Sequence, residues 1–565
     1  MRKPRSVLPA VSATAPELWF ERHPERREWE LAEFARRELP AQDSVINGIL
    51  TVATTMSFRG KNVEIQVAYP DAYPDVPPIV FGPPLLGRHQ VLGPSGGNFC
   101  LLEQPDSEWW PAMSAAELVD VDLRRLLGDS EQGPEVVAAG EADMPEPMSG
   151  HIAYERGKAV LFPDPFWALE LPAAGGELAF VDVLPGISWI VSSVDGLAAP
   201  DDRLVKQYAA TKGSRHVATW ATLSDVPSWP TYTDLLAAAE QADPSLLRRV
   251  KKGLKQDSRR SADEGWVAVT FIEEGPHVGE KRRAWVFLHV RVTRHGQKEV
   301  LGAVRAQALT ASERERRIPE LAGLGDSQVL VVGAGSLGGP VTLELAKAGV
   351  GHVHVIDKDF YDVNNAVRHV ASTRYAGMDK EQAVAFDARN LNPFVEVHPH
   401  HVNVAGTAED GQRLDTLIGV ADLVIDTTGS QSVGRVLQRR CREQSKTMVL
   451  AALTAGSYGG EVAIFVDDGP CFFCFVLAQD AKDIPKPLEG PRSNVTPVGC
   501  SHPAFSGAGF DATALAALAA RTAICATGKS AYPAPDYNYV IVNFRGEHPW
   551  RQGTLECQSG CPLCG

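Results

Sequence analysis

The cysteines of this chain are its residues with the clearest chemical use, and four of them are paired. Cys471 and Cys474 form one Cys-x-x-Cys motif, and Cys561 and Cys564 form a second near the end of the chain. Two such pairs suit a tetrahedral site in which four thiolates hold a structural Zn²⁺ ion. Two unrelated pairs of buried or redox-active cysteines would show the same spacing. We predict a Cys₄ zinc site that ties the end of the chain to the body of its domain.

Two other cysteines lie alone and are candidate nucleophiles. Cys100 follows a Gly-Asn-Phe segment, and Cys500 follows a proline-rich stretch typical of a loop. A lone cysteine is more often a small buried hydrophobic residue than a nucleophile. Because nine cysteines are an odd number and the first residues lack a secretory apolar segment, we expect reduced thiols rather than disulfides. The sequence around Cys441, Cys525 and Cys557 indicates structural roles, with Cys557 a minor rival for zinc.

A glycine-rich segment between these cysteines is typical of a nucleotide-binding turn. The apolar run 328–332 predicts a short strand, and Gly333, Gly335 and Gly338 follow it at the start of a helical pattern. Glycines at this spacing allow a tight turn and a close approach of the backbone to phosphate. Asp357 ends the next predicted strand and is placed to bind a ribose hydroxyl. By itself this pattern favours an NAD(P) enzyme over an ATP enzyme.

Polar residues after Asp357 change that balance. Asn365, Arg368 and Lys380 supply the cationic reach that a triphosphate needs, although they could also solvate a surface helix. The segment resembles the adenylation domain of ubiquitin-activating (E1) enzymes and of their ThiF/MoeB-type bacterial relatives, which activate sulfur-carrier proteins. The resemblance implies that the glycine turn and Asp357 bind the adenosine, that Asn365 and Arg368 meet the phosphates, and that Lys380 completes the pocket. Asp359 would assist them.

The resemblance also bears on the metals and on the second nucleophile. Where the family has a second aspartate that holds Mg²⁺, this chain has Gly429, so either Asp426 takes that role or triphosphate and water hold the ion. Similar zinc knuckles occur in the family, which supports the Cys₄ prediction. Ubiquitin-activating relatives carry their thioester cysteine in a crossing loop, and this implies a catalytic role for Cys500. The expected cofactors are ATP, Mg²⁺ and Zn²⁺.

The segment around Cys100 resembles ubiquitin-conjugating (E2) enzymes. A proline-rich stretch, YPDAYPDVPP, precedes Cys100, and Trp109-Trp110-Pro111 follows it, as in that family. The resemblance implies that Cys100 accepts an acyl group by transthiolation. The family's His-Pro-Asn triplet, which helps to stabilise the oxyanion, is absent. His89, Gln90 and Asn98 are left as candidates for that role.

Composition and patterning divide the chain into parts. We expect an α+β E2-like domain at 14–128, a linker at 129–150, a β-containing middle domain of unknown role at 151–310, and an α/β Rossmann-like E1 domain at 311–565. The net charge of −15 argues against nucleic acid as the main ligand, and the basic run 248–252 is typical of a solvated helix face. No run of about 18 apolar residues is expected, which favours a cytoplasmic protein.

This order of domains resembles bacterial E2–E1 fusions such as the Cap2-type proteins of antiviral CBASS operons. The resemblance implies that the C-terminal carboxylate of a separate protein is adenylated, caught as a thioester on Cys500, passed to Cys100 and joined to a target amine. The partner would be a cyclic-nucleotide synthase or a ubiquitin-like protein, and the adenylation domain would form a homodimer. The alternatives are conjugation of a ubiquitin-like protein in another type of operon, a sulfur-carrier adenylyltransferase with an inert Cys100, an NAD(P) oxidoreductase and a catalytically inactive scaffold.

Overall fold

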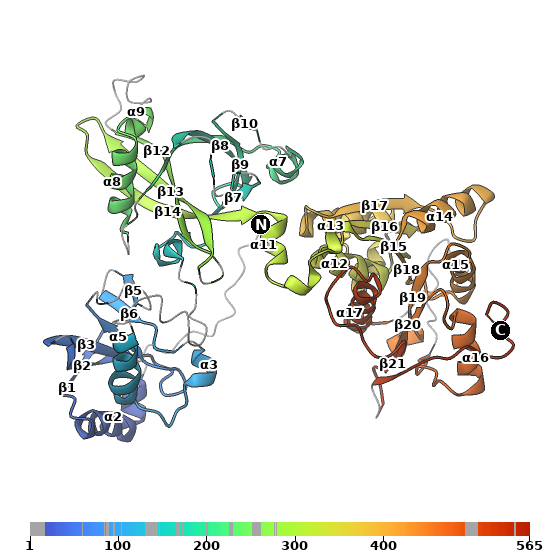
Figure 1. Cartoon of the computed structure of the whole chain (residues 1–565), viewed down its shortest axis with the longest axis horizontal. Coiled ribbons are helices and arrows are strands. Elements are labelled where there is room, and N and C mark those ends of the chain that lie inside the picture. The colour runs from blue at the N-terminus through green and yellow to red at the C-terminus, as the bar shows by residue number, and fades with distance from the viewer. Residues whose placement is uncertain are drawn as a thin grey trace. The chain divides into compact units, whose positions relative to one another are not determined.

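The computed structural model divides the chain into two compact units, Met1–Leu309 and Thr310–Gly565, whose elements are labelled in Figure 1. It describes residues 17–564, with the exception of 59, 84, 86–89, 94–95, 103, 130–144, 146, 165, 168–169, 172–173, 196, 199–201, 225, 227–229, 251–261, 276, 278, 492–506 and 547–549. Most of the predicted linker, Lys251 and Lys252 of the basic run, His89 and Cys500 therefore lie outside the described residues. Three sheets organise the remainder.

The first sheet is antiparallel, with the strand order β1-β2-β3-β4-β6-β5. Its strands are β1 (Ala41–Ile46), β2 (Ile49–Phe58), β3 (Lys61–Tyr69), β4 (Ile79–Gly82), β5 (Gln90–Gly93) and β6 (Gly96–Phe99). Helices α1 (Trp19–Arg22) and α2 (Pro24–Arg36) precede it, and α3 (Pro105–Glu108), α4 (Ala115–Glu117), the π-helical turn η1 (Leu118–Leu123) and α5 (Arg124–Asp129) follow. The sequence predicts one helical stretch over 16–39. Two helices form instead because Pro24 lacks the N–H that a helix interior needs and begins a new helix.

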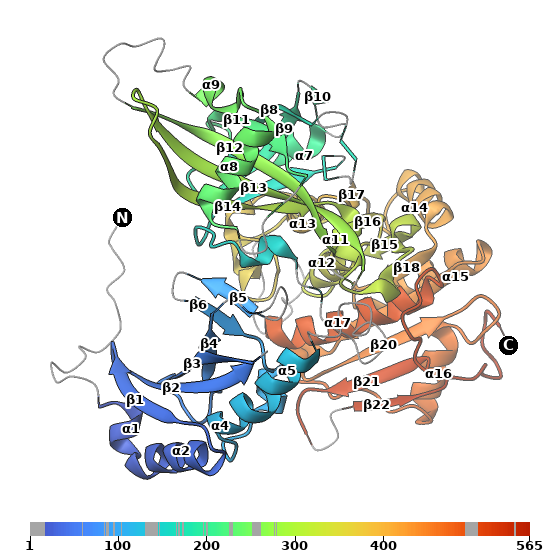
Figure 2. The same cartoon turned by 60° about the vertical axis from the view of Figure 1, so that its left-hand side comes forward.

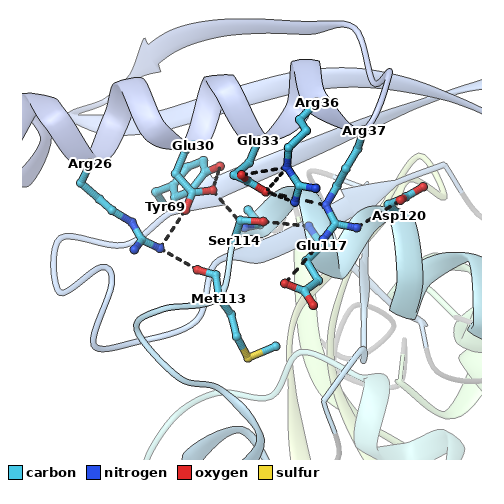
Figure 3. Close-up of polar contacts among 11 residues, drawn as sticks. Arg26, Glu30, Glu33, Arg36, Arg37, Tyr69, Met113, Ser114, Glu117 and Asp120 are labelled. Atoms are coloured by element: carbon cyan, nitrogen blue, oxygen red, sulfur yellow. Dashed lines mark hydrogen bonds and ion pairs between the residues drawn. The ribbon is translucent and has the colours of Figure 1, made fainter.

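A buried carboxylate joins α2 to the segment after the Cys100 region (Figure 3). Glu30 is 1% exposed and accepts hydrogen bonds from Arg26 Nη2 at 2.9 Å and from the Ala115 backbone N–H at 2.9 Å. Arg26 also donates to the Met113 carbonyl at 2.6 Å. Burial raises the pKa of Glu30, whereas its hydrogen bonds act in the opposite direction. The buried pair of Arg26 and Glu30 therefore holds the chain in place where α4 begins.

The second sheet lies in the middle of the chain and contains β7 (Ala159–Pro163), β8 (Gly175–Leu184), β9 (Ser188–Val194), β10 (Leu197–Ala198), β11 (Arg215–Thr222), β12 (Ala262–Glu274), β13 (Lys281–Thr293) and β14 (Lys298–Leu309). Its order is β10-β9-β7-β14-β13-β12-β11-β8, and β8 also pairs with β9, so the sheet closes on itself. An aromatic core that includes Phe162, Trp220 and Trp285 fills one face. Helices α8 (Tyr232–Ala242) and α9 (Leu246–Val250) pack on a separate aliphatic core, while α7 (Asp202–Tyr208) contacts β9.

The third sheet forms the C-terminal unit, with the order β17-β16-β15-β18-β19-β20-β21-β22. Its strands are β15 (Gln328–Val332), β16 (His352–Asp357), β17 (Glu396–His401), β18 (Leu423–Asp426), β19 (Thr447–Leu453), β20 (Gly459–Phe465), β21 (Tyr539–Asn543) and β22 (Trp550–Gly553). The first five strands in that order are parallel, and β20, β21 and β22 join antiparallel (Figure 2). The predicted strand 328–332 coincides with β15.

Helices cover both faces of this sheet. Helices α12 (Gly338–Ala348), α13 (Lys380–Leu391) and α17 (Gly509–Ala526) contribute to one hydrophobic core. Helices α14 (Ala408–Val420), α15 (Gln431–Glu443) and α16 (Phe472–Ala481) contribute to the other. Such a doubly covered parallel sheet is the expected Rossmann-like arrangement. Contrary to the expectation from sequence, α17 is long and apolar enough to cross a membrane, but half of it is buried, and it packs against α12 and β19 as a core helix.

Candidate functional site

A cavity of about 590 Å³ opens at the carboxyl ends of the central strands of the C-terminal sheet. It lies where β15 has β16 on one side and β18 on the other, which is the point at which the strand order reverses. Ligands of open α/β sheets bind at such switch points. Seven residues predicted from the sequence line the cavity: Gly333, Gly335, Asp357, Asp359, Asn365, Arg368 and Lys380.

The glycine turn packs too closely for side chains. Gly333 has a φ of 98°, in the left-handed region that favours glycine. A Cβ on Gly338 would lie 1.7 Å from the Gly333 carbonyl oxygen, so α12 can begin this close to the turn only with glycine there. Gly338 does not line the cavity itself. It contributes to the site by letting α12 pack closely against the turn at Gly333. Thr427 Oγ1 donates to the Gly333 carbonyl oxygen at 2.9 Å and joins the turn to the end of β18.

Asp357 closes the turn from the next strand. Its Oδ2 accepts a hydrogen bond from the Ala334 N–H at 2.7 Å, and its Oδ1 accepts from the Lys358 and Asp359 N–H groups at 2.7 and 2.9 Å. These three donors hold the carboxylate at the cavity wall. A carboxylate at this place can accept hydrogen bonds from the hydroxyls of a ribose.

The cationic side of the cavity is formed by Arg368 and Lys380. Arg368 Nη2 donates to Asn365 Oδ1 at 3.1 Å, and Lys380 Nζ lies 3.0 Å from Asp359 Oδ2. Burial lowers the pKa of Arg368, because the charged form loses hydration there. Two cations in a partly desolvated cavity favour a polyanionic ligand, since phosphate oxygens can replace the lost water.

The aspartate proposed from sequence as a magnesium ligand lies behind the cavity wall. Asp426 is fully buried, and its Oδ1 accepts from the Thr428 N–H at 2.9 Å and from Thr428 Oγ1 at 2.7 Å. Gly429 does line the cavity, with a φ of 65° and open space where a side chain would stand. Among the described carboxylates on the cavity, Asp359 is the more accessible oxygen donor. The role of Asp426 stays a prediction.

Several polar residues of the cavity were not predicted from the sequence. His369 accepts a hydrogen bond from the Ala371 N–H at Nδ1 (3.1 Å), so its Nε2–H donates to the Ala334 carbonyl oxygen (2.7 Å). Burial lowers the pKa of His369, which favours this neutral form. Asn403 and Thr428 also line the cavity. Asn403 follows β17, which carries no recognised motif. Only its position at the carboxyl edge of the sheet could have indicated that Asn403 belongs to the site.

The four paired cysteines meet at the start of α16. The sulfur atoms of Cys471 and Cys561 are 3.4 Å apart, and those of Cys474 and Cys564 are 3.3 Å apart. A Zn–S distance of about 2.3 Å would place the sulfurs of a tetrahedron about 3.8 Å apart. The cluster is slightly more compact than that, and Gln558 N–H donates to Cys474 Sγ at 3.3 Å. The four thiols therefore fit a Zn²⁺ ion in number, type and spacing.

Cys100 of the N-terminal unit is exposed and directly follows β6. Trp109 Nε1 donates to the Pro74 carbonyl oxygen at 2.7 Å, which joins the tryptophan after Cys100 to the proline-rich stretch before it. Gln90 is fully buried, and its amide bonds to the Pro83 carbonyl (2.8 Å) and the Leu85 N–H (2.9 Å). Gln90 is thus engaged as a structural residue. Of the predicted oxyanion donors, only Asn98, on β6 beside Cys100, is described and partly exposed.

Comparison with known proteins assigns the C-terminal site to a class. Residues 313–545 match the model of the ThiF family. The chain is 28% identical over 97% of its length, and of the relative's, to the uncharacterized protein y4oA of Sinorhizobium fredii. It is 32% identical to the SAMP-activating enzyme E1 of Haloferax volcanii, over 31% of this chain and 63% of that one. The C-terminal unit therefore carries an E1-like adenylation domain of the ThiF type.

Two further likenesses each cover less than half of the chain. The adenylyltransferase and sulfurtransferase UBA4 of Candida albicans is 34% identical over 28% of this chain and 36% of its own. The structure of E. coli MccB with succinimide overlaps 45% of this chain and 74% of its own, with 18% identity and a TM-score of 0.35. The chain thus spans 63% of the SAMP-activating enzyme and 36% of UBA4.

Proposed function

We propose that the C-terminal unit uses ATP to adenylate the C-terminal carboxylate of a separate protein. The observation that carries this proposal is the convergence of Asp357, Arg368 and Lys380 on one cavity around the glycine turn. A carboxylate oxygen attacks the α-phosphorus of ATP, the bond to the bridging oxygen of the β-phosphate breaks, and pyrophosphate leaves. Arg368 and Lys380 offset the charge that develops on the phosphates.

Magnesium would be held mainly by the triphosphate and water, with Asp359 as the nearest protein carboxylate. Mg²⁺ keeps several waters in protein sites, so the loss of the family's aspartate at Gly429 is compatible with its binding. When bound, the ion supplies positive charge beside the phosphates. Lys380 now pairs with Asp359 and would turn to the phosphates as Asp359 turns to the ion.

The relay is the finer part of the proposal. The Cys500 thiolate attacks the acyl carbon of the adenylate, a thioester forms and AMP leaves. The Cys100 thiolate then attacks that thioester, and the Cys500 thiolate is released. A target amine finally attacks the carbonyl carbon of the second thioester, the C–S bond breaks to release the Cys100 thiolate, and the amine nitrogen loses a proton as the amide forms. Two observations support this step: Cys100 is exposed, and its flanking segments are joined through Trp109.

Partners and setting complete the proposal. The activated protein would be a cyclic-nucleotide synthase or a ubiquitin-like protein, in a cytoplasmic antiviral system of the CBASS type or in another bacterial operon. Three apolar side chains near the cavity support a homodimer through the adenylation domain: Phe360 is 61% exposed, and Val367 and Phe510 are each 73% exposed.

A second candidate is a sulfur-carrier adenylyltransferase, in which Cys100 takes no part. The likeness to an adenylyltransferase and sulfurtransferase, which covers 28% of this chain, favours it. This candidate shares the adenylation step. It differs only after the adenylate has formed, so a single set of variants separates the two.

The test combines ATP–pyrophosphate exchange with non-reducing gels, using candidate partner proteins. Lys380→Ala should lose exchange, whereas Lys347→Ala, an exposed lysine of α12, should retain it. Cys500→Ala should retain exchange but form no thiol-sensitive adduct. Cys100→Ala should keep the adduct on Cys500 and lose transfer to amines, with exposed Cys557→Ala as the unaffected control. Wild-type conjugation by Cys100→Ala would refute the relay, whereas pyrophosphate release by wild type without any thiol-sensitive adduct would favour the carrier enzyme.

A further inference from the structure

Four histidines line the outer strands of the C-terminal sheet on one face. His352 and His354 alternate along β16, and His398 and His400 alternate along the edge strand β17. Side chains two residues apart in a strand point to the same face. The intervening Val353 points to the opposite face, where it is buried in the core with α12 and α13. The histidines therefore belong to the other face of the sheet.

Two of these histidines converge on one carboxylate. His352 Nδ1 lies 3.5 Å from Glu396 Oε2, and His398 Nε2 lies 3.6 Å from the same oxygen. The three potential ligand atoms are all within 4.8 Å of one another. Metal–ligand distances of about 2.0–2.1 Å put neighbouring ligands of a tetrahedral site about 3.4 Å apart. The two distances from histidine nitrogen to Glu396 Oε2 are already close to this value, and all three atoms lie within 4.8 Å of one another.

We propose that His352, Glu396 and His398 form a binding site for a divalent transition-metal ion such as Zn²⁺. Imidazole nitrogen and carboxylate oxygen are ligands that suit Zn²⁺, and two histidines with one carboxylate leave a coordination position for water. The site is accessible, because the three side chains are 39%, 46% and 39% exposed. Neither the adenylation chemistry nor the Cys₄ cluster uses any of these residues.

The surroundings support a built site. The His354 and His398 rings stack with centroids 4.8 Å apart, and His354 Nδ1 lies 3.0 Å from His400 Nε2. His398 therefore lies in a group of adjacent imidazole rings on this face of the sheet. The nearby cation of α13, Arg389, donates to the Val397 carbonyl oxygen, and that of α14, Arg413, pairs with Glu409 at 3.5 Å. Arg389 also acts on His398 through its charge, whereas Glu409, the partner of Arg413, is not one of the three ligands.

The position of this site gives the metal a structural use. β16 runs from His352 to Asp357, so the site and the nucleotide cavity lie at opposite ends of the same strand. An ion here would join β17, the edge strand, to β16. Residues after β17, among them Asn403, form part of the cavity wall. Metal binding would therefore stabilise the edge strand that leads into the nucleotide site.

The experiment counts zinc bound to the full-length chain. Protein dialysed against excess Zn²⁺ is separated by gel filtration and analysed for metal, and the double variant His352→Ala/His398→Ala is treated in the same way. We expect the double variant to bind one equivalent fewer per chain than wild type. The His295→Ala control, which removes an exposed histidine of the N-terminal unit, should bind as much as wild type. Equal zinc in wild type and double variant would overturn the proposal.

A second measurement separates this site from the Cys₄ cluster and does not depend on the double variant folding. Glu396→Gln keeps the size of the side chain but removes its charge. It should bind Co²⁺ at this site more weakly, with loss of d–d absorption and no change in thiolate-to-cobalt bands. A Co²⁺ titration of Glu396→Gln identical to that of wild type would contradict the ligand set. Loss of the thiolate bands alone would place the change at the cysteines and would likewise contradict it.

Discussion

Asp426 offers a test of how burial, rather than a ligand role, sets the behaviour of a residue beside the nucleotide cavity. Its side chain is fully buried, and Oδ2 has no hydrogen-bond partner in the described part of the chain. Burial raises the pKa of Asp426 from an ordinary 3.8 to about 6, although its hydrogen bonds from Thr428 oppose the rise. At neutral pH the folded protein therefore holds an ionised carboxylate in an unfavourable place.

The sign of the effect follows from linkage. The folded pKa lies above the unfolded one, so the stability associated with the protonated form is complete below pH 3.8 and is lost as the pH rises through about 6. A difference of about two pKa units corresponds to roughly 3 kcal/mol, which is a ceiling. Asp426→Asn keeps an acceptor for Thr428 and cannot ionise. Any other effect of the amide on stability does not change with pH. The free energy of unfolding of the variant, relative to that of wild type, should therefore rise by up to ~3 kcal/mol between pH 4 and pH 7.5.

The assay is scanning calorimetry of the full chain without nucleotide, at several pH values. One kcal/mol shifts the midpoint of a domain of 150–250 residues by about 2–4 °C, so the ceiling corresponds to roughly 6–12 °C. The exposed Asp536→Asn serves as the matched control and should run parallel to wild type. Parallel profiles for Asp426→Asn and wild type would refute the reasoning. If Asp426 also binds Mg²⁺ during the reaction, the stabilised variant would in addition lose ATP–pyrophosphate exchange.

Two further variants test the zinc cluster and the buried ion pair. Cys474→Ser should remove the zinc equivalent that resists chelators and lower the midpoint of unfolding, because a structural zinc contributes folding free energy; metal analysis checks this, and unchanged zinc would contradict it. Glu30→Gln leaves the Arg26 charge, only 17% exposed, without its partner, and should destabilise the N-terminal unit by about 3 kcal/mol. Glu33→Gln, which pairs with the more exposed Arg36, should cost at most about 1 kcal/mol in the same calorimetric experiment.

Local patterns accounted for the elements that carry the nucleotide site. The strand 328–332 and the glycine turn were predictable because a short apolar run and the spacing of the glycines act through neighbouring residues, and the run is buried almost throughout. The predicted roles of Arg368 and Lys380 came from resemblance, and the structure places both on the cavity. The sequence predicts one N-terminal helical stretch, but a new helix begins at Pro24, because proline has no N–H to donate inside a helix.

Other features depend on contacts between residues far apart in the sequence. Spacing predicted two cysteine pairs, but only the tertiary structure brings Cys471 to within 3.4 Å of Cys561, ninety positions away. The sequence predicted only that residues 151–310 contain β structure. The closed order of their strands could not be deduced, because it is set by packing between distant segments. The register of β16 against β17 likewise decides that His352 and His398 share Glu396. The sequence by itself determined which residues can do chemistry and the local elements that carry them, whereas register and burial, which are non-local, decided which of those residues meet.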